Sequence, residues 1–203
     1  MKTIIFDFWH TLAYRPRLTP IVMKYKNAPK AKLKDLFEDT LQLKKWKNFD
    51  HMFDALVKGL NADLSEKDYK EFKKKLTANF FNSALYSDVK ETLEGLKKHR
   101  LILLSNATQF DKQQAEKFGI TKYFDKCFYS YEMKTRKPEA FDYIIKKLKL
   151  NPKDCIMVGD SYKHDYLGAK KAGMNALYLD RAKTNQGGKD RITRLKQVVS
   201  RHG

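Results

Sequence analysis

Acidic side chains follow two of the apolar runs in this 203-residue sequence. Asp7 comes directly after the run 4–6, and burying a carboxylate there is costly unless a cation meets it. Asp160 and Asp165 follow the run 156–158, after Gly159, which permits a tight exit from that run. Mg²⁺ is usually held in proteins by one or two carboxylates, water and substrate phosphate. The two later acids are therefore candidate magnesium ligands.

Two further polar motifs supply groups that bind anions. Ser105 and Asn106 end the apolar run 101–104, and both can donate hydrogen bonds to an anion. Lys137 stands directly before Pro138, where a helix is predicted to begin. A lysine so placed is a point charge for phosphate and can keep a nearby carboxylate ionised.

These polar groups need a scaffold that brings them together, and the apolar runs predict one. The runs 4–8, 101–104, 156–158 and 176–179 are continuous rather than alternating, which is typical of strands buried on both faces. Helical patterns separate the later runs, and strand-helix alternation indicates a parallel sheet. Open parallel sheets place their ligands at the carboxyl ends of the strands, where all four polar motifs fall. The predicted fold class is α/β, with a Rossmann-like parallel core.

Helix boundaries around this core are predicted from capping residues. Asp88 with Glu91 fits a capping box for a helix that runs to about His99, and Gly119 and Gly173 stand where helices should end in a left-handed residue. A predicted loop over 185–188 precedes a last helix with four apolar positions. Those positions are Ile192, Leu195, Val198 and Val199.

The stretch 15–86 differs from the rest because it shows helical spacing and no strand signal. Thr19-Pro20 and Ser65 with Asp68 mark helix starts. We predict a helical bundle over 15–86, inserted into a core domain formed by 1–14 and 87–203.

Composition excludes several classes of protein. The sequence is 42% hydrophobic and 13% aromatic, which argues against a disordered chain. No apolar run approaches the roughly 20 residues that cross a bilayer, and no signal-peptide pattern follows Met1, so we expect no membrane association and a cytoplasmic location. Cys127 and Cys155 lie in apolar stretches and are expected to be reduced core thiols.

The net charge of +18 suggests anionic partners. Fifteen basic and nine acidic side chains fall between residues 16 and 86, and seven basic and one acidic fall between 181 and 203. We interpret this as a lysine-rich solvated surface that also favours phosphorylated metabolites, with nucleic-acid binding as the alternative. No pattern indicates an oligomeric state.

The order, spacing and content of the four motifs resemble the haloacid dehalogenase-like superfamily, which includes many phosphatases, over nearly the whole chain. Members carry D-x-D-x-T on the first strand, Ser or Thr on the second, a Lys, and a GDxxxxD-like acidic pair. Here these are Asp7 with Thr11, then Ser105, Lys137, and Asp160 with Asp165. The resemblance also implies a helical cap that closes over small substrates, matching 15–86.

Roles for the matched residues follow from the resemblance. Asp7 would attack phosphorus to form an aspartyl phosphate, and Asp7, the Trp9 carbonyl and Asp160 would bind Mg²⁺, with Asp165 acting through water. The remaining matched residues would bind the phosphoryl oxygens of a small phosphorylated substrate. This phosphate-binding set is Thr11, Ser105, Asn106 and Lys137.

Position 9 departs from the family pattern. Most phosphatases of this type carry a second Asp there as general acid, and the Trp9 indole cannot exchange a proton at useful pH. One interpretation is a phosphatase for good leaving groups, such as acyl or sugar-1-phosphates. Another is a phosphatase whose acid is His10, because histidine is the side chain that ordinarily exchanges protons near neutral pH.

Two other classes of function stay open. Haloacid dehalogenases of the superfamily also lack that Asp and attack carbon without a metal, although 33–60 contains no Arg of the sort they use. A weakly active member could instead bind a phosphorylated ligand or nucleic acid, and a phosphotransferase that keeps its aspartyl phosphate is a minor further option. Substrate identity is not readable from the sequence. Candidate specificity contacts are Trp46, Lys44, Lys45 and Arg17, for each of which a core aromatic or surface charge is the simpler interpretation.

Overall fold

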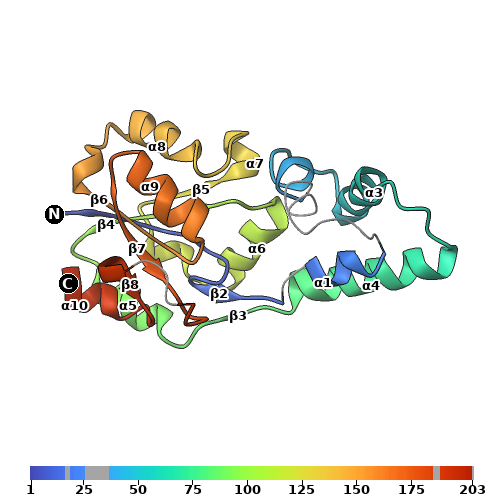
Figure 1. Ribbon diagram of the computed structural model, residues 1–203, viewed down its shortest axis with the longest axis horizontal. Helices are drawn as coiled ribbons and strands as arrows, with labels where there is room; N and C mark the ends of the chain where they lie inside the picture. The colour runs from blue at the N-terminus through green and yellow to red at the C-terminus, as the bar shows by residue number, and fades with distance from the viewer. Residues whose placement is uncertain (17–18, 26–36, 185–187, 203) are drawn as a thin grey trace.

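A six-stranded parallel sheet forms the centre of the computed structural model, which describes residues 1–16, 19–25, 37–184 and 188–202 (Figure 1). Its spatial order is β5-β4-β1-β6-β7-β8, and each neighbouring pair is parallel. The strands are β1 (Thr3–Phe6), β4 (Arg100–Ser105), β5 (Lys126–Tyr129), β6 (Cys155–Gly159), β7 (Asn175–Leu179) and β8 (Arg191–Ile192). The predicted Rossmann-like α/β core is confirmed.

Apolar side chains cover both faces of this sheet. Ile4 and Phe6 of β1 belong to one buried cluster, which also includes residues of α5 (Val89–Gly95) and α10 (Gln197–His202). Ile5 belongs to a second cluster, with residues of α8 (Ala140–Leu148) and α9 (Gly168–Lys171). Figure 1 shows α8 and α9 on one side of the sheet and α5 and α10 on the other. Burial on both faces explains why the four strands predicted from the sequence read as continuous apolar runs.

Helices connect and cover the strands of the core. The α-helices are α5 (Val89–Gly95), α6 (Gln109–Lys117), α7 (Ser130–Met133), α8 (Ala140–Leu148), α9 (Gly168–Lys171) and α10 (Gln197–His202). Short 3-10 turns are η2 (Thr121–Tyr123), η3 (Pro152–Asp154) and η5 (Gly188–Asp190), and η4 (Tyr162–Leu167) is a π-helix. Gly119 and Gly173 have φ values of +66° and +79° after α6 and α9, so the predicted left-handed helix ends are confirmed.

Three local predictions were wrong. Asp88 makes no capping hydrogen bond, because its carboxylate accepts from the Arg181 guanidinium at 2.9 Å and from the Leu195 amide at 2.9 Å; its helix also ends at Gly95. Ile192 lies in β8, so the last helix begins only at Gln197. Strands β5 and β8 were missed, since β5 begins with charged Lys126 and β8 has two residues.

A helical region lies between β1 and β4 in the sequence and projects from one end of the sheet (Figure 1). It comprises α1 (Thr19–Met23), the π-helix η1 (Phe37–Leu41), α3 (Phe49–Leu60) and α4 (Glu66–Phe81), around an apolar cluster of its own. The predicted start at Ser65 is confirmed, because its hydroxyl accepts from the Asp68 amide at 3.1 Å. The treatment of 15–86 as a separate domain stays a prediction.

Two short strands stand where the helical region joins the core. β2 (Ala13–Tyr14) pairs antiparallel with β3 (Ala84–Leu85), so the segment predicted to have no strand contains one at its end. The pair is two residues long on each side, too short to leave a pattern in the sequence. It holds together the two chain segments that enter and leave the helical region.

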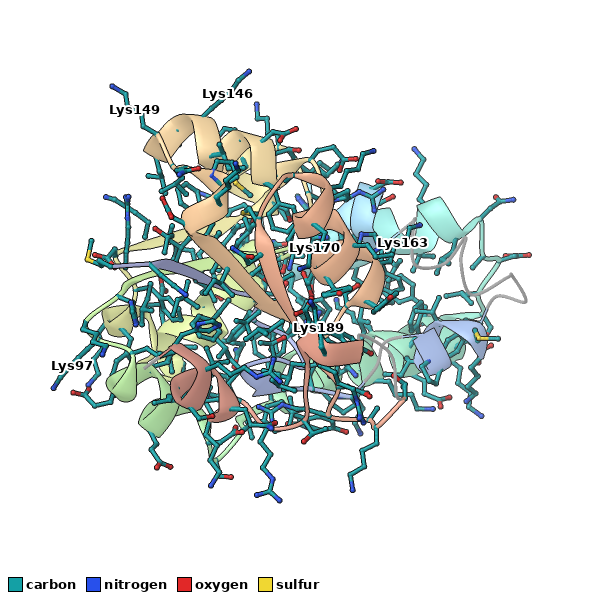
Figure 2. All side chains as sticks on the ribbon, turned by 60° about the vertical axis from the view of Figure 1, so that its left-hand side comes forward. Lys97, Lys146, Lys149, Lys163, Lys170 and Lys189 are labelled. Carbon is teal, nitrogen blue, oxygen red and sulfur yellow. The ribbon has the colours of Figure 1, made fainter. Side chains whose placement is uncertain are left out.

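Positive charge is spread over the surface rather than gathered on one element. In Figure 2, Lys146 and Lys149 point away from α8, whereas Lys97 points outward from another side of the core. In the basic stretch 181–203, part of the positive charge is neutralised within the protein, since Arg191 pairs with Asp180 at 2.8 Å. This spread favours the solvated-surface interpretation, and nucleic-acid binding stays an untested alternative.

Two smaller expectations concern the cysteines and membranes. Cys127 and Cys155 are both free thiols, as predicted. Within the described ranges, no helix has the length and apolar character needed to cross a membrane. Of the predicted loop over 185–188, residues 185–187 lie outside the described residues, and Gly188 begins the 3-10 turn η5.

Candidate active site

The ends of three adjacent strands gather the predicted site residues. Asp7 follows β1, Ser105 ends β4 and Asp160 follows β6, and β1 lies between β4 and β6 in the sheet. The Asp7 amide still donates to the Val158 carbonyl at 3.0 Å, which extends the β1–β6 pairing by one bond. Parallel pairing therefore brings together residues about 150 positions apart in the sequence, as the strand-end pattern predicted.

Lys137 connects two of the acids at the centre of this site. Its ammonium donates to Asp7 Oδ1 and to Asp165 Oδ1, each at 2.6 Å, and only 3% of its side chain is exposed. Burial opposes the charge of Lys137, but Asp165 and Asp7 outweigh that effect and raise its pKa. The lysine therefore stays protonated throughout the ordinary pH range.

The ionisation of Asp7 is balanced between burial and charge. Burial raises the pKa of its carboxyl group to about 6, the Lys137 ammonium opposes that rise, and the Asp165 carboxylate adds to it. Asp7 is thus largely ionised at neutral pH, yet poorly solvated. A desolvated carboxylate of this kind is a better nucleophile than one that is fully hydrated.

Three carboxylates converge closely enough to hold a cation. Oxygen atoms of Asp7, Asp160 and Asp165 lie within 4.8 Å of one another. Gly159 makes this approach possible, because a Cβ there would stand 2.3 Å from Asp165 Oδ2. The sequence pattern predicted that Gly159 permits a tight exit from the strand. The structure shows that the absence of a side chain at Gly159 leaves room for Asp165. An all-oxygen donor set fits Mg²⁺ better than a softer metal.

Thr11 ties two loops of the site together. Its hydroxyl donates to Asp7 Oδ2 at 3.5 Å and accepts from the Asp160 amide at 3.1 Å. The side chain is fully buried and does not line the cavity. Its expected contact with phosphate is untested, and the geometry indicates a bridge between the nucleophile loop and the acidic loop.

Ser105 and Asn106 differ in what they offer an anion. Ser105 Oγ is buried and has no hydrogen-bond partner among the described residues, although buried hydroxyls are normally paired. Asn106 Oδ1 accepts from the Lys137 amide at 2.8 Å, so this side chain helps position the lysine. Ser105 therefore presents an unused hydrogen-bonding group beside the acids.

A cavity of about 310 Å³ opens over these groups. The predicted site residues that line it, with Thr11 the exception, are Asp7, Trp9, His10, Ser105, Asn106, Lys137, Asp160 and Asp165. Four further residues line the same cavity without having been predicted: Arg15, Gln42, Ser161 and His164. His164 and Ser161 lie inside the acidic motif and could have been found there, but no sequence pattern marks Arg15 or Gln42.

The Trp9 side chain is held away from proton transfer. Its indole Nε1–H donates to Asp111 Oδ1 at 3.0 Å, and the Arg15 guanidinium lies 4.1 Å from its ring centroid. Arg15 also donates to Asp111 Oδ1, at 2.6 Å. The position that bears an acid in most phosphatases of this pattern is therefore filled by a packed aromatic ring.

The three specificity candidates from the sequence that the structure describes, Trp46, Lys44 and Lys45, do not line the cavity. The Trp46 indole donates to the Leu41 carbonyl at 3.0 Å and packs in the helical cluster, and Lys44 lies over its ring, 4.3 Å from the centroid. Lys45 is exposed, and Arg17 lies outside the described residues. The simpler interpretation of a core aromatic residue and surface charges was the right one for Trp46, Lys44 and Lys45.

Comparison with known proteins agrees with this geometry. A family model described as haloacid dehalogenase-like hydrolase matches residues 1–173. N-acylneuraminate-9-phosphatase of Homo sapiens is 33% identical over 120 residues, covering 57% of this chain and 47% of that protein. Phosphoglycolate phosphatase of Vibrio parahaemolyticus is 34% identical over 131 residues, covering 59% and 57%. The chain thus spans about half the length of the curated relatives it matches.

Solved structures share the fold over the whole chain. The crystal structure of a phosphatase from Thermococcus onnurineus aligns with a TM-score of 0.66 and 22% identity, covering 100% of this chain and 98% of that one. This likeness supports the arrangement of sheet and helical region described above.

Proposed function

The chain belongs to the haloacid dehalogenase-like hydrolase family, and we propose that it is a Mg²⁺-dependent phosphatase acting on a small phosphate monoester through an aspartyl phosphate on Asp7. The observation that carries the proposal is the pairing of buried Lys137 with Asp7 and Asp165, beside Asp160. The Ser105 hydroxyl, which has no partner in the part of the chain that the structure describes, lies in the same site. Relatives named for the dephosphorylation of N-acylneuraminate 9-phosphate and phosphoglycolate support a small phosphorylated metabolite as substrate.

Asp7 is the nucleophile in this proposal. One carboxylate oxygen of Asp7 forms a bond to phosphorus as the ester P–O bond breaks and the alkoxide leaves with a proton from solvent or a nearby acid. Water then attacks phosphorus, releases inorganic phosphate and restores the carboxylate. Lys137 keeps Asp7 ionised and offsets the charge of the phosphoryl group, while the Ser105 hydroxyl and the Asn106 amide donate to its oxygens.

The acidic residues divide the work of holding the metal. Mg²⁺ bound by Asp7, the Trp9 carbonyl and Asp160 would supply charge screening between the substrate phosphate and the Asp7 carboxylate. Both oxygens of Asp165 are already engaged, Oδ1 by the Lys137 ammonium and Oδ2 by the Ser161 amide at 2.9 Å. This favours an indirect role for Asp165, through water and through Lys137.

The packing of Trp9 bears on which esters can be cleaved. With its N–H donated to Asp111 and its ring covered by Arg15, Trp9 supplies no proton to the leaving group. We propose that good substrates release a leaving group of low pKa, as acyl and sugar-1-phosphates do. His10 lines the cavity and is the alternative proton donor. An unchanged pH profile in His10→Ala would remove it from consideration.

The proposal is tested by a screen of phosphorylated metabolites with Mg²⁺, followed by mass spectrometry of protein quenched during turnover. We expect phosphate release and a phosphate adduct on the peptide that carries Asp7. Halide release from 2-chloropropionate in EDTA would instead identify a dehalogenase. Salt-sensitive RNA or DNA binding without any turnover would identify a binding protein.

A further inference from the structure

Arg15 brings hydrogen-bond donors to the cavity that the proposed chemistry does not use. The residue follows β2, lines the cavity and is only 8% exposed. Among the described residues, its one hydrogen-bond acceptor is Asp111 Oδ1, which engages Nη1. A guanidinium carries five N–H donors, and buried donors normally find acceptors. The remaining donors of Arg15 are therefore available to a ligand in the cavity.

The guanidinium is fixed in position before any ligand arrives. It lies 4.1 Å from the Trp9 ring centroid and 5.0 Å from that of Phe80, which belongs to the helical region. Asp111 is fully buried, and its Oδ2 accepts from the amide and hydroxyl of Thr108. These bonds fix the Asp111 carboxylate, which in turn fixes the Arg15 guanidinium that it pairs with. A fixed guanidinium loses little conformational entropy when it binds, which favours a tight and directional contact.

Gln42 supplies a second unused polar group to the same cavity. Its side-chain Oε1 is buried and unpaired among the described residues. Its backbone carbonyl accepts from the Ser130 hydroxyl at 2.7 Å, and that hydroxyl in turn accepts from the Ala107 amide at 2.9 Å. Gln42 is thus anchored to the loop that follows Ser105 and lies at a fixed position relative to the phosphate-binding groups.

We propose that Arg15 and Gln42 form a leaving-group subsite that selects phosphate esters whose leaving group carries a carboxylate. This inference rests on the proposed phosphatase function. A planar carboxylate can accept two hydrogen bonds from one edge of a guanidinium. The unpaired side-chain oxygen of Gln42 is suited to accept from a hydroxyl group next to that carboxylate. The cavity of about 310 Å³ limits the leaving group to a short chain.

A matched pair of substrates tests the subsite. Glycerate 3-phosphate and glycerol 3-phosphate share chain length and a primary leaving oxygen, and differ in a carboxylate against a hydroxymethyl group. Primary alkoxides are poorer leaving groups than those of the best substrates proposed above, so both esters should turn over slowly, and the ratio of their kcat/KM values cancels this shared loss. We expect the wild-type protein to prefer the carboxylate, and Arg15→Met to lower the ratio of the two kcat/KM values about tenfold or more. Lys44→Met, outside the cavity, should leave the ratio and both activities unchanged. An equal loss on both substrates in Arg15→Met would overturn the subsite.

Gln42→Met is a second test of the subsite that is less prone to a folding defect than Arg15→Met, since it removes no buried charge. It should lower the same ratio about threefold to tenfold, because one hydrogen bond is lost. An unchanged ratio would exclude Gln42 from the subsite.

Binding of glycerate separates this inference from the proposed function. We expect glycerate, but not glycerol, to change the tryptophan fluorescence of the Mg²⁺-loaded wild-type protein, because Trp9 lies against Arg15. Glycerate binding without phosphatase activity would overturn the proposed function and support the subsite. Turnover of both esters without a preference for the carboxylate, or without glycerate binding, would overturn the subsite alone.

Discussion

The two walls of the cavity are positioned by different means. On the sheet side, Asp7, Ser105 and Asp160 follow parallel strands whose backbone pairing fixes their separation. On the helical side, Arg15 and Gln42 are held by side-chain contacts to Asp111 and Ser130. The first kind of wall keeps its geometry as long as the sheet forms, whereas the second depends on single side chains that contact Arg15 and Gln42. We infer that the chemistry is set by the sheet and the choice of substrate by the helical side.

Removal of the nucleophile gives the largest expected effect on the sheet side. Asp7→Asn should lower kcat by about 10⁴-fold or more, because no aspartyl phosphate can form. Phosphate release with a metabolite found in the screen measures this effect. Asp50→Asn is a matched control, since that exposed carboxylate pairs with Lys73 in the helical region and does not line the cavity. Turnover in Asp7→Asn within tenfold of the wild type would refute the mechanism.

Lys137→Met tests how far the sheet side depends on one buried cation. Asp7 and Asp165 would then face each other without their shared partner, and we expect the free energy of unfolding to fall by about 3–5 kcal/mol. Urea unfolding measures the change. Lys170→Met is the control, because its pair with Asp190 is partly exposed to solvent and worth about 0–1 kcal/mol. Similar losses in both variants would mean that the buried network contributes no special stability.

Replacing Trp9 tests whether the site lacks a general acid for the leaving group. For aryl phosphates, the wild-type rate should fall steeply as the pKa of the leaving phenol rises. Trp9→Asp should flatten that dependence and speed the poorest leaving groups about tenfold, below the full effect of a positioned acid. Trp9→Phe keeps an aromatic ring against Arg15 and should retain the steep slope. A flat slope in the wild type would indicate that another residue already supplies the proton.

Metal binding should depend on pH through Asp7. Burial, opposed by Lys137 and assisted by Asp165, raises the pKa of Asp7 to about 6 in the metal-free protein. The ligand must be ionised, so Mg²⁺ affinity should be nearly constant above pH 7 and weaken about tenfold for each pH unit below about 6. Calorimetric titration of Mg²⁺ between pH 5 and 8 measures this. Affinity independent of pH over that range would exclude Asp7 as a ligand.

The contrast between the walls also explains what could be predicted from the sequence. Asp7, Ser105 and Asp160 were found because apolar strands ending in polar residues form a local pattern, and parallel strands align their ends. Arg15 and Gln42 were not found, since nothing near them in the sequence shows that Asp111 or Ser130 will hold them. The failed capping prediction at Asp88 has the same origin: its partners Arg181 and Leu195 lie about 100 residues away.

Loosening the helical side alone should give the smallest effect, and one of a different kind. Gln109 is the first residue of α6, and its side chain accepts from the Trp46 amide at 2.7 Å and donates to the Trp46 carbonyl at 2.9 Å. Trp46 is close in sequence to Gln42, so these two bonds help to hold the segment that carries Gln42. Gln109→Leu should raise KM about threefold to tenfold with kcat within about twofold, because substrate contacts shift while the strand ends stay fixed. Gln113→Leu, exposed on the same helix, should change neither. A loss of kcat with unchanged KM would mean that the helical side helps position the reacting groups, and the two walls would not be separable.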